Sequence, residues 1–285
     1  MPSPYTEMNG TEFQNNVVNA LASIELTRKD RLLTTSIICT LDDVLMTRAE
    51  MENGIEYIEE LVGTSVQRKL YPAEMFNIAD EKGDTVDDGY IDIDYTQRDR
   101  RSLEGEDLNS LNLEVLAPVT YRVKIANQAT LDLVGAAGRT PRLEVSLYKQ
   151  ELSRDAKGKQ TESQKVMLTN VRKPVQVTSL TKEFIYEGSG RSIQSLRFFT
   201  DKITFIQIEK AGTPVQKFSL ATLQHLQRRA RLTPQADMVT ILGETMRARY
   251  TDGDTLNNLV LKVTLTLSAI EDHEAVIEEM GPLRA

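Results

Sequence analysis

The sequence predicts an all-β protein, mainly β with short inserted helices, folded as two tandem jelly-roll β-barrels. Many short segments alternate apolar and polar residues between turn signals, which is the pattern of sandwiches and barrels. The 285 residues reach the length of about 250 to 300 residues at which one hydrophobic core stops growing. Each half also runs from early strands through an inserted amphipathic helix to later strands, which is compatible with a jelly roll of two Greek keys.

The pattern divides the chain into four parts. Residues 1–19 are polar and predict an N-terminal arm, followed by a first jelly roll over residues 20–150. Residues 151–172 begin with a stretch almost free of apolar side chains, which predicts a linker or an exposed hairpin. Residues 173–285 predict the second jelly roll with a C-terminal tail. Because the arm is too polar for a core position, we expect it to be ordered only against a neighbouring subunit or a membrane surface.

In the first half, period-2 alternation predicts the strands, and two helices are expected to interrupt them. Thr40 and Asp43 resemble a capping box, which predicts a helix that starts at Thr40. Asn53 and Glu56 repeat this spacing and predict a second helix. Strands are expected at residues 20–26, 31–40, 90–95, 111–116, 120–125, 131–134 and 143–148.

The second half repeats this plan. Ser219 is expected to start a helix with an apolar stripe formed by Leu220, Leu223 and Leu226. A short acidic helix at residues 271–279 is expected to close the chain. Strands are expected at residues 175–186, 192–199, 202–208, 238–250 and 259–267.

Composition narrows the function classes. The chain carries 34 Lys and Arg against 42 Asp and Glu, a formal net charge of −8, with two histidines and one cysteine. These counts do not supply the usual zinc ligand set, and the sequence has no phosphate-binding loop, dinucleotide fingerprint or nucleophile elbow. We therefore predict no catalytic residue, no cofactor-binding residue and no metal ligand, hence a binding or structural protein and not an enzyme. Cys39 lies in an apolar run and is expected to be a small buried hydrophobe.

The first polar feature that could form a site is a run of aspartates: Asp84, Asp87, Asp88, Asp92 and Asp94. Carboxylate oxygens of this kind could bind a hard cation such as calcium. Their spacing differs from that of the EF-hand loop, so a solvated loop that leads into a strand is the favoured interpretation.

Two further features are short. Arg98, Arg100 and Arg101 could pair with a neighbouring subunit or approach lipid headgroups, although such a basic run is more often a solvated turn. Asn9 begins a glycosylation sequon, but a chain made in a cytoplasm would not meet the glycosylation machinery.

The last feature is the polar face of the helix after Ser219, which is expected to point outward: Gln224, Gln227, Arg228, Arg229 and Arg231. Basic residues on a helix invite a nucleic-acid interpretation, but this face lacks interleaved aromatic residues and the whole chain is acidic. Cations in the last turn also complement the helix dipole, and we favour that interpretation.

The order of elements in the second half carries a family resemblance. It consists of the strand at residues 203–212, Phe218 with the helix at residues 220–230, the strand at residues 259–267, and residues 275–281. In this order the second half resembles the C-terminal barrel of the double jelly-roll major capsid proteins of tailless, membrane-containing icosahedral bacteriophages, of the corticovirus and tectivirus type. The first half is similar by architecture only.

The resemblance implies a structural function. Such proteins form trimers whose six barrels stand upright and tile an icosahedral shell around an internal membrane. The implied partners are the chain itself in a homotrimer, neighbouring trimers, penton and membrane-associated virion proteins, and a lipid membrane through the N-terminal arm. Direct contact with nucleic acid is not expected, because the chain is acidic. The implied location is the virion capsid after synthesis in the host cytoplasm, since the first residues lack a signal-peptide pattern.

Two alternatives stay open at this stage. The chain could be a minor capsid, spike or tail structural protein with sandwich domains. From another class, it could be a carboxylate-dependent hydrolase on a β-scaffold, because acidic pairs can act as general acid and base without His or Cys. The mass of the expressed chain in solution discriminates between them, since the capsid interpretation requires trimers or larger arrays.

Overall fold

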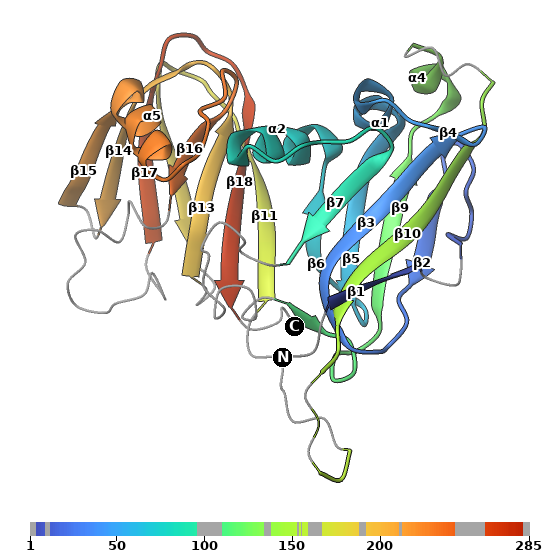
Figure 1. Cartoon of the computed structure of the whole chain (residues 1–285). Coiled ribbons are helices and arrows are strands. Elements are labelled where there is room, and N and C mark those ends of the chain that lie inside the picture. The colour runs from blue at the N-terminus through green and yellow to red at the C-terminus, as the bar shows by residue number, and fades with distance from the viewer. Residues whose placement is uncertain are drawn as a thin grey trace. The chain divides into compact units, whose positions relative to one another are not determined.

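The computed structural model describes residues 4–8, 12–95, 110–133, 138–152, 154, 156–158, 167–187, 192–210, 213–242 and 260–281. These residues form two compact units (Figure 1). Unit 1 contains the chain up to Phe76 and Val86–Leu168, and unit 2 contains Asn77–Thr85 and Thr169–Gly281. Each unit has its own hydrophobic core.

Unit 1 is built from two antiparallel sheets. The first has the order β1 (Pro4–Met8), β10 (Pro141–Gln150) and β3 (Arg31–Leu41), and β3 also pairs with β4 (Val44–Leu45), β7 (Tyr90–Asp94) and β8 (Leu111–Asn112). The second has the order β2 (Leu21–Glu25), β9 (Val119–Ile125), β5 (Ile55–Val62) and β6 (Ser65–Leu70). The helices are α1 (Arg48–Gly54), α2 (Pro72–Lys82) and α4 (Gln128–Leu133).

Unit 2 also consists of two antiparallel sheets. One has the order β11 (Met167–Val175), β18 (His273–Gly281), β13 (Ser192–Phe199) and β16 (Val239–Leu242). The other has the order β12 (Thr181–Glu187), β17 (Val260–Leu267), β14 (Ile203–Lys210) and β15 (Thr213–Ser219). Strand β15 leads directly into α5 (Leu220–Arg229), as Figure 1 shows.

Both units share one strand order. The four strands β1-β10-β3-β7 of unit 1 correspond to β11-β18-β13-β16 of unit 2, and β2-β9-β5-β6 correspond to β12-β17-β14-β15. Helix α2 follows β6, and helix α5 follows the corresponding strand β15. Eight main strands in two such sheets form a jelly roll, so the predicted fold class, two tandem jelly rolls with short inserted helices, is confirmed.

The alternating apolar residues of the strands point into the hydrophobic cores, as the sequence predicts. In β17, Leu261, Val263, Leu265 and Leu267 are buried while the residues between them are partly exposed. Strands β2, β3, β7, β9, β10, β13 and β14 also lie where the sequence predicts them. Ser219 caps α5 as expected, because its hydroxyl accepts a hydrogen bond from the Thr222 N–H.

The N-terminal segment differs from the expected arm. Pro4–Met8 forms β1, which pairs along its whole length with β10, and Phe13 is buried in the core of unit 1. In the shared strand order β1 corresponds to β11, so it is the first strand of the first jelly roll. The expectation that this segment is ordered only by a neighbour is therefore wrong, because an edge strand needs only alternate apolar contacts and its backbone partners. Strand β11 likewise starts at Met167, inside the expected linker.

Two expected helices of the first half are replaced by strands. After β3, Asp42 and Asp43 have φ of 50° and 63° and form a tight turn into β4, so no helix starts at Thr40. The capping box belongs to α1, where Thr47 and Glu50 satisfy each other's backbone groups. Helix α1 ends at Gly54, where the second helix was expected.

Strand β5 explains why a helical stripe was predicted there. Its register shifts between Ile55 and Tyr57 against β9 and between Glu60 and Leu61 against β6. Each bulge displaces the alternation by one residue, so buried positions recur at a spacing that resembles a helix. Two other expectations are also wrong: residues 131–134 contain the end of α4, and residues 271–279 contain β18, not a helix.

Candidate functional site

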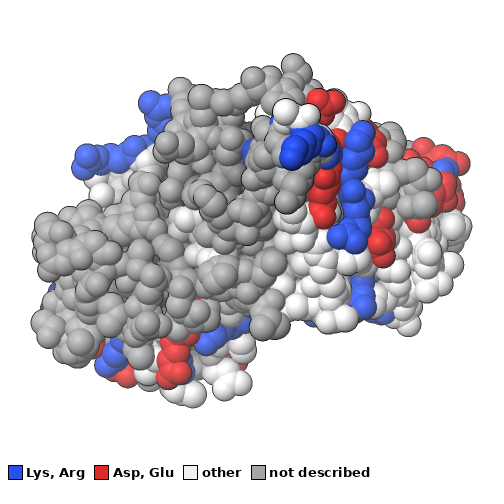
Figure 2. All heavy atoms as spheres, turned by 90° about the horizontal axis from the view of Figure 1, so that it is seen from below, with Lys and Arg blue, Asp and Glu red and all other residues white. Residues whose placement is uncertain are grey.

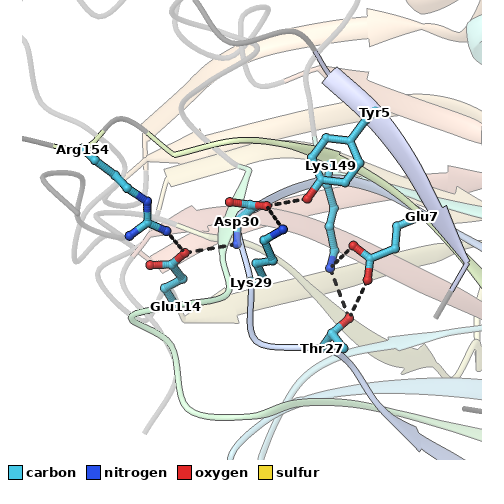
Figure 3. A network of polar contacts seen from close by, with 8 residues as sticks. All are labelled: Tyr5, Glu7, Thr27, Lys29, Asp30, Glu114, Lys149 and Arg154. Atoms are coloured by element: carbon cyan, nitrogen blue, oxygen red, sulfur yellow. Dashed lines mark hydrogen bonds and ion pairs between the residues drawn. The ribbon is translucent and has the colours of Figure 1, made fainter. Parts of the chain in front are cut away.

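Strand β1 brings two side chains into a polar network of unit 1 (Figure 3). The Tyr5 hydroxyl donates a hydrogen bond to the Asp30 carboxylate. The Lys149 ammonium, which has no exposed surface, lies 3.3 Å from the Glu7 carboxylate and 3.2 Å from the Thr27 hydroxyl. These contacts join β1, β10 and the segment between β2 and β3.

The same network extends to the segments beyond β8 and β10. Arg154 lies 2.5 Å from the Glu114 carboxylate, and Glu114 accepts a hydrogen bond from the Asp30 backbone N–H at 3.5 Å. Burial raises the pKa of the Tyr5 phenol, and its hydrogen bond with Asp30 acts in the same direction. Tyr5 therefore stays neutral and donates to Asp30, so the network holds strands in place and offers no activated nucleophile.

A second polar cluster lies inside the core of unit 1. Tyr95 donates a hydrogen bond to Glu60 at 2.8 Å, and the Arg68 guanidinium lies 3.8 Å from the same carboxylate. The Tyr121 hydroxyl contacts that of Tyr95 and donates to the Thr35 hydroxyl at 3.1 Å. Because Thr35 belongs to β3 and Tyr121 to β9, the cluster bridges the two sheets.

The pKa values in this cluster are relevant to the alternative that the chain is a carboxylate-dependent hydrolase. Burial raises the pKa of Glu60, while Arg68 and Tyr95 oppose that shift. Burial also raises the pKa of Tyr95 and of Tyr121. A carboxyl with a raised pKa suits a general acid, but Glu60 has no exposed surface and cannot meet a substrate. The arrangement connects the two sheets of unit 1 through buried polar side chains.

Unit 2 contains two buried charged contacts. The Arg197 guanidinium lies 2.9 Å from the Glu81 carboxylate, and both side chains are almost fully buried. Tyr186 donates a hydrogen bond to Glu279, which has no exposed surface. Glu81 belongs to the part of α2 that is counted with unit 2, and its backbone carbonyl also accepts from the Thr233 N–H at 2.6 Å.

The five aspartates form no cation cage. Asp92 accepts a hydrogen bond from the Ser36 hydroxyl at 2.5 Å, and Asp94 accepts one from the Thr34 hydroxyl at 3.0 Å, each from the strand beside it. Asp88 accepts from the backbone N–H of Arg48 at 3.1 Å. Within the described ranges, no group of three His, Cys, Asp or Glu side chains is arranged to hold a metal ion.

The helix face of α5 is only partly as predicted. Arg228, Arg229 and Arg231 are exposed, but Gln227 is buried and its amide donates to the Thr240 carbonyl at 3.2 Å. The expectation that Gln227 faces outward is wrong, because it lies one turn after Leu223 on the buried side of the helix.

Three further side chains that could take part in catalysis, Cys39, His225 and His273, lie apart from these clusters. Cys39 is buried as expected, and burial raises the pKa of its thiol, so a reactive thiolate is disfavoured. His225 is exposed on α5, whereas His273 lies in β18, where burial lowers its pKa. The basic run at residues 98–101 and the sequon at residues 9–11 lie outside the described residues.

The charges on the surface are interleaved. Figure 2 shows acidic and basic side chains side by side on the described part of the face seen from below. Arg142, for example, lies within 3.3 Å of carboxylates of Glu12, Asp43 and Glu144. Among the helices described, none has the length and apolar composition needed to cross a membrane.

Sequence reasoning missed the buried charges, although a signal for them exists. Lys149 falls on the same alternate positions of β10 as Leu143, Val145 and Leu147. Glu279 follows Ala275 and Ile277 in the same way along β18. A charged residue that occupies the same alternate positions of a strand as buried apolar residues is expected to be buried too. It then needs a hydrogen-bond or ion-pair partner.

Comparison with solved structures finds this fold in viral capsid proteins. The chain matches the major capsid protein P2 of bacteriophage PM2 with a TM-score of 0.77 and 11% identity, over 99% of this chain and 98% of P2. VP54 of PBCV-1 matches with a TM-score of 0.68 and 10% identity over 98% and 94% of the two chains. The STIV major capsid protein matches with a TM-score of 0.64 and 9% identity over 98% and 97%.

These matches confirm the double jelly-roll resemblance for the whole chain at the level of the fold. A scan of the sequence against protein-family models and a search of curated proteins found no match.

Proposed function

We propose that this chain is the major capsid protein of an icosahedral virus with an internal membrane. One observation carries the proposal: two jelly rolls with the same strand order occupy one chain, and this whole arrangement corresponds to major capsid proteins over nearly the full length of both partners. A match over two tandem jelly rolls is stronger evidence for a shared function than a match to one barrel, because single jelly rolls occur in proteins with many unrelated functions.

In this proposal the working unit is a homotrimer. Three copies supply six barrels of similar topology, and trimers associate side by side into a shell around the membrane. Penton proteins and membrane-associated proteins of the virion complete the set of partners, and the acidic chain makes no direct contact with nucleic acid. Membrane contact through residues 1–19 has less support, because Pro4–Met8 and Phe13 are part of unit 1. The protein is made in the host cytoplasm and resides in the virion capsid.

The proposal also includes the absence of catalysis. It is supported by the burial of Glu60, Tyr95 and Tyr121, whose pKa values are raised but whose side chains have almost no exposed surface. Function then lies in the surfaces between subunits. Contacts within a trimer are expected to be larger and more apolar than contacts between trimers, because a lattice must correct errors before it closes.

The test is the mass of the expressed chain. Size-exclusion chromatography with light scattering should give the mass of three chains, and electron microscopy at higher protein concentration should show hexagonal arrays or shells. Mild denaturant should release trimers from shells well before monomers unfold. A chain that stays monomeric under all assembly conditions contradicts the proposal and favours a minor capsid, spike or tail role, and a monomer that hydrolyses a substrate contradicts it outright.

A further inference from the structure

His273, the first residue of β18, packs against the aromatic core of unit 2. Its ring lies nearly perpendicular to that of Phe198, with ring centroids 6.0 Å apart and an interplanar angle of 73°. Phe198 contacts Phe184 in the same manner, at 5.4 Å and 84°. Because Phe184 belongs to β12 and Phe198 to β13, this aromatic row joins the two sheets of unit 2, and the His273 ring lies at its end.

The two ring nitrogens of His273 have different surroundings. Nδ1 lies 3.2 Å from the Glu271 backbone carbonyl, which can only accept, so this contact selects the neutral tautomer with the proton on Nδ1. Nε2 is buried and has no hydrogen-bond partner among the described residues. A proton on Nε2 would create a charged, buried N–H without an acceptor, which costs more free energy than an unpaired lone pair. The site therefore fits the neutral imidazole and disfavours the imidazolium.

Burial lowers the pKa of His273 although acidic residues lie near it. Three carboxylates oppose the shift: Asp272, Glu271 and Glu274. Each of them has another partner in unit 2. Glu271 lies 3.8 Å from the Lys202 ammonium, which also pairs with Asp201 at 2.6 Å. Glu274 lies 3.4 Å from Nε of Arg172 in β11, and Asp272 accepts a hydrogen bond from a backbone N–H.

Two connections between the sheets of unit 2 lie side by side next to His273. Residues 176–180 join β11 to β12, and residues 268–272 join β17 to β18, so both pass from one sheet to the other. The Leu267 N–H, at the start of the second connection, donates to the Leu180 carbonyl at the end of the first, at 2.8 Å.

Asp272 fastens these two connections together. Its carboxylate accepts a hydrogen bond from the Val177 N–H at 2.7 Å, and Val177 is buried in the core of unit 2. Because Asp272 is bonded directly to His273, a ring that leaves its site displaces the residue that holds this contact. The protonation state of His273 is thereby coupled to the closure of one end of the jelly roll.

We propose that His273 is an acid-sensitive latch, in which a proton taken up from solvent by Nε2 releases the ring and opens the connections at residues 176–180 and 268–272. The charged ring finds water as its acceptor only outside the site, and the hydrogen bond between Asp272 and Val177 breaks as the ring leaves. The pairing of β13 with β18 is kept. The latch lies within unit 2 and operates whether or not the chain assembles into a capsid.

The sign of the pH effect follows from the two states of the latch. In the open state His273 regains its ordinary pKa of about 6.5, whereas burial lowers the pKa in the closed state. The closed state is therefore fully stabilised above about pH 6.5 and loses stability as the pH falls below that value. Between pH 7.5 and 5.5 the open population should rise about three- to tenfold, because a histidine with a pKa of about 6.5 is about tenfold more often protonated than neutral at pH 5.5.

The test is amide hydrogen exchange of the full chain, followed by mass spectrometry at pH 7.5 and 5.5 and corrected for the intrinsic pH dependence of exchange. Protection of residues 176–180 and 268–273 should fall about three- to tenfold at pH 5.5. Protection of residues 261–266, in the middle of β17, should stay the same. Equal protection of the two connections at both pH values overturns the latch, and so does an equal loss of protection in β17.

Variants of the two histidines identify the group that titrates. His273→Asn keeps a donor near the Glu271 carbonyl without a titrating ring, so its protection should be the same at both pH values. His273→Phe keeps an aromatic ring against Phe198 and should also abolish the pH response, which covers the case of an unfolded asparagine variant. His225→Asn is the matched control, because it removes the only other histidine of the chain, which is exposed on α5. A response that persists without His273, or that is lost without His225, overturns the proposal.

Discussion

Replacing Arg197 by methionine should be among the most destabilising single changes in unit 2. The Arg197 side chain is 3% exposed and the Glu81 side chain 1% exposed, and Nε lies 2.9 Å from the Glu81 carboxylate. Methionine keeps much of the apolar volume but leaves Glu81 as an uncompensated buried charge. Breaking a buried pair in this way costs about 3 to 5 kcal/mol of unfolding free energy.

Replacing the partner Glu81 by methionine should cost less unfolding free energy than Arg197→Met. In Glu81→Met, Arg197 keeps its hydrogen bond to the Ser195 hydroxyl and lies 3.7 Å from Glu278, which is partly exposed. We expect a loss of about 1 to 3 kcal/mol, the typical cost of one lost polar partner. The double variant has two apolar side chains and no orphan charge, so its cost should fall below the sum of the single costs by at least about 1 kcal/mol.

Urea unfolding followed by circular dichroism measures all three variants. The matched control is Lys202→Met, because Lys202 is 30% exposed and pairs with Asp201 and Glu271, whose side chains are 57% and 59% exposed. Exposed pairs of this kind contribute about 1 kcal/mol or less. Strict additivity of the two single changes, or an Arg197→Met cost no larger than the control, would refute the assignment of a buried, coupled pair.

Three other changes test the fold. Leu265→Ala should cost about 2 to 5 kcal/mol because Leu265 is fully buried in β17, whereas Thr264→Ala on the other face should cost under about 0.5 kcal/mol; equal costs in chemical unfolding would contradict the alternation. Deleting residues 1–8 should lower the melting temperature of unit 1, because it removes β1 and leaves buried Lys149 without Glu7; an unchanged melting curve would support a detached arm. Since burial raises the pKa of Glu60 above its ordinary value of 4.5, its ionisation destabilises the folded state as the pH rises above that value. Glu60→Gln should therefore reduce the loss of unfolding free energy that the wild type shows on raising the pH above that value, and a pH profile identical to wild type would contradict this.

The sequence predicts the strands whose side chains alternate without interruption. In β17 and β9 every second residue is buried, so a period of two reports the buried face directly. Strand β5 was missed because its two register shifts displace the buried positions, and alternation from one sequence contains no information on a bulge. Helix α2 was not predicted, although two residues mark its ends. Pro72 lies at its first position, and Gly83 lies just past its end with φ of 75°.

The buried charges could be predicted only in part. The positions of Lys149 and Glu279 within alternating rows indicate that they point inward. Their partners, Glu7 and Tyr186, lie 142 and 93 residues away along the chain, and strand pairing over such distances is not visible in a periodic pattern. The same holds for Glu81 and Arg197, which are 116 residues apart.

The shared strand order of the two units has a physical explanation. Apolar alternation determines the topology, so both units keep the same eight main strands, while polar residues outside the alternating rows are free to differ.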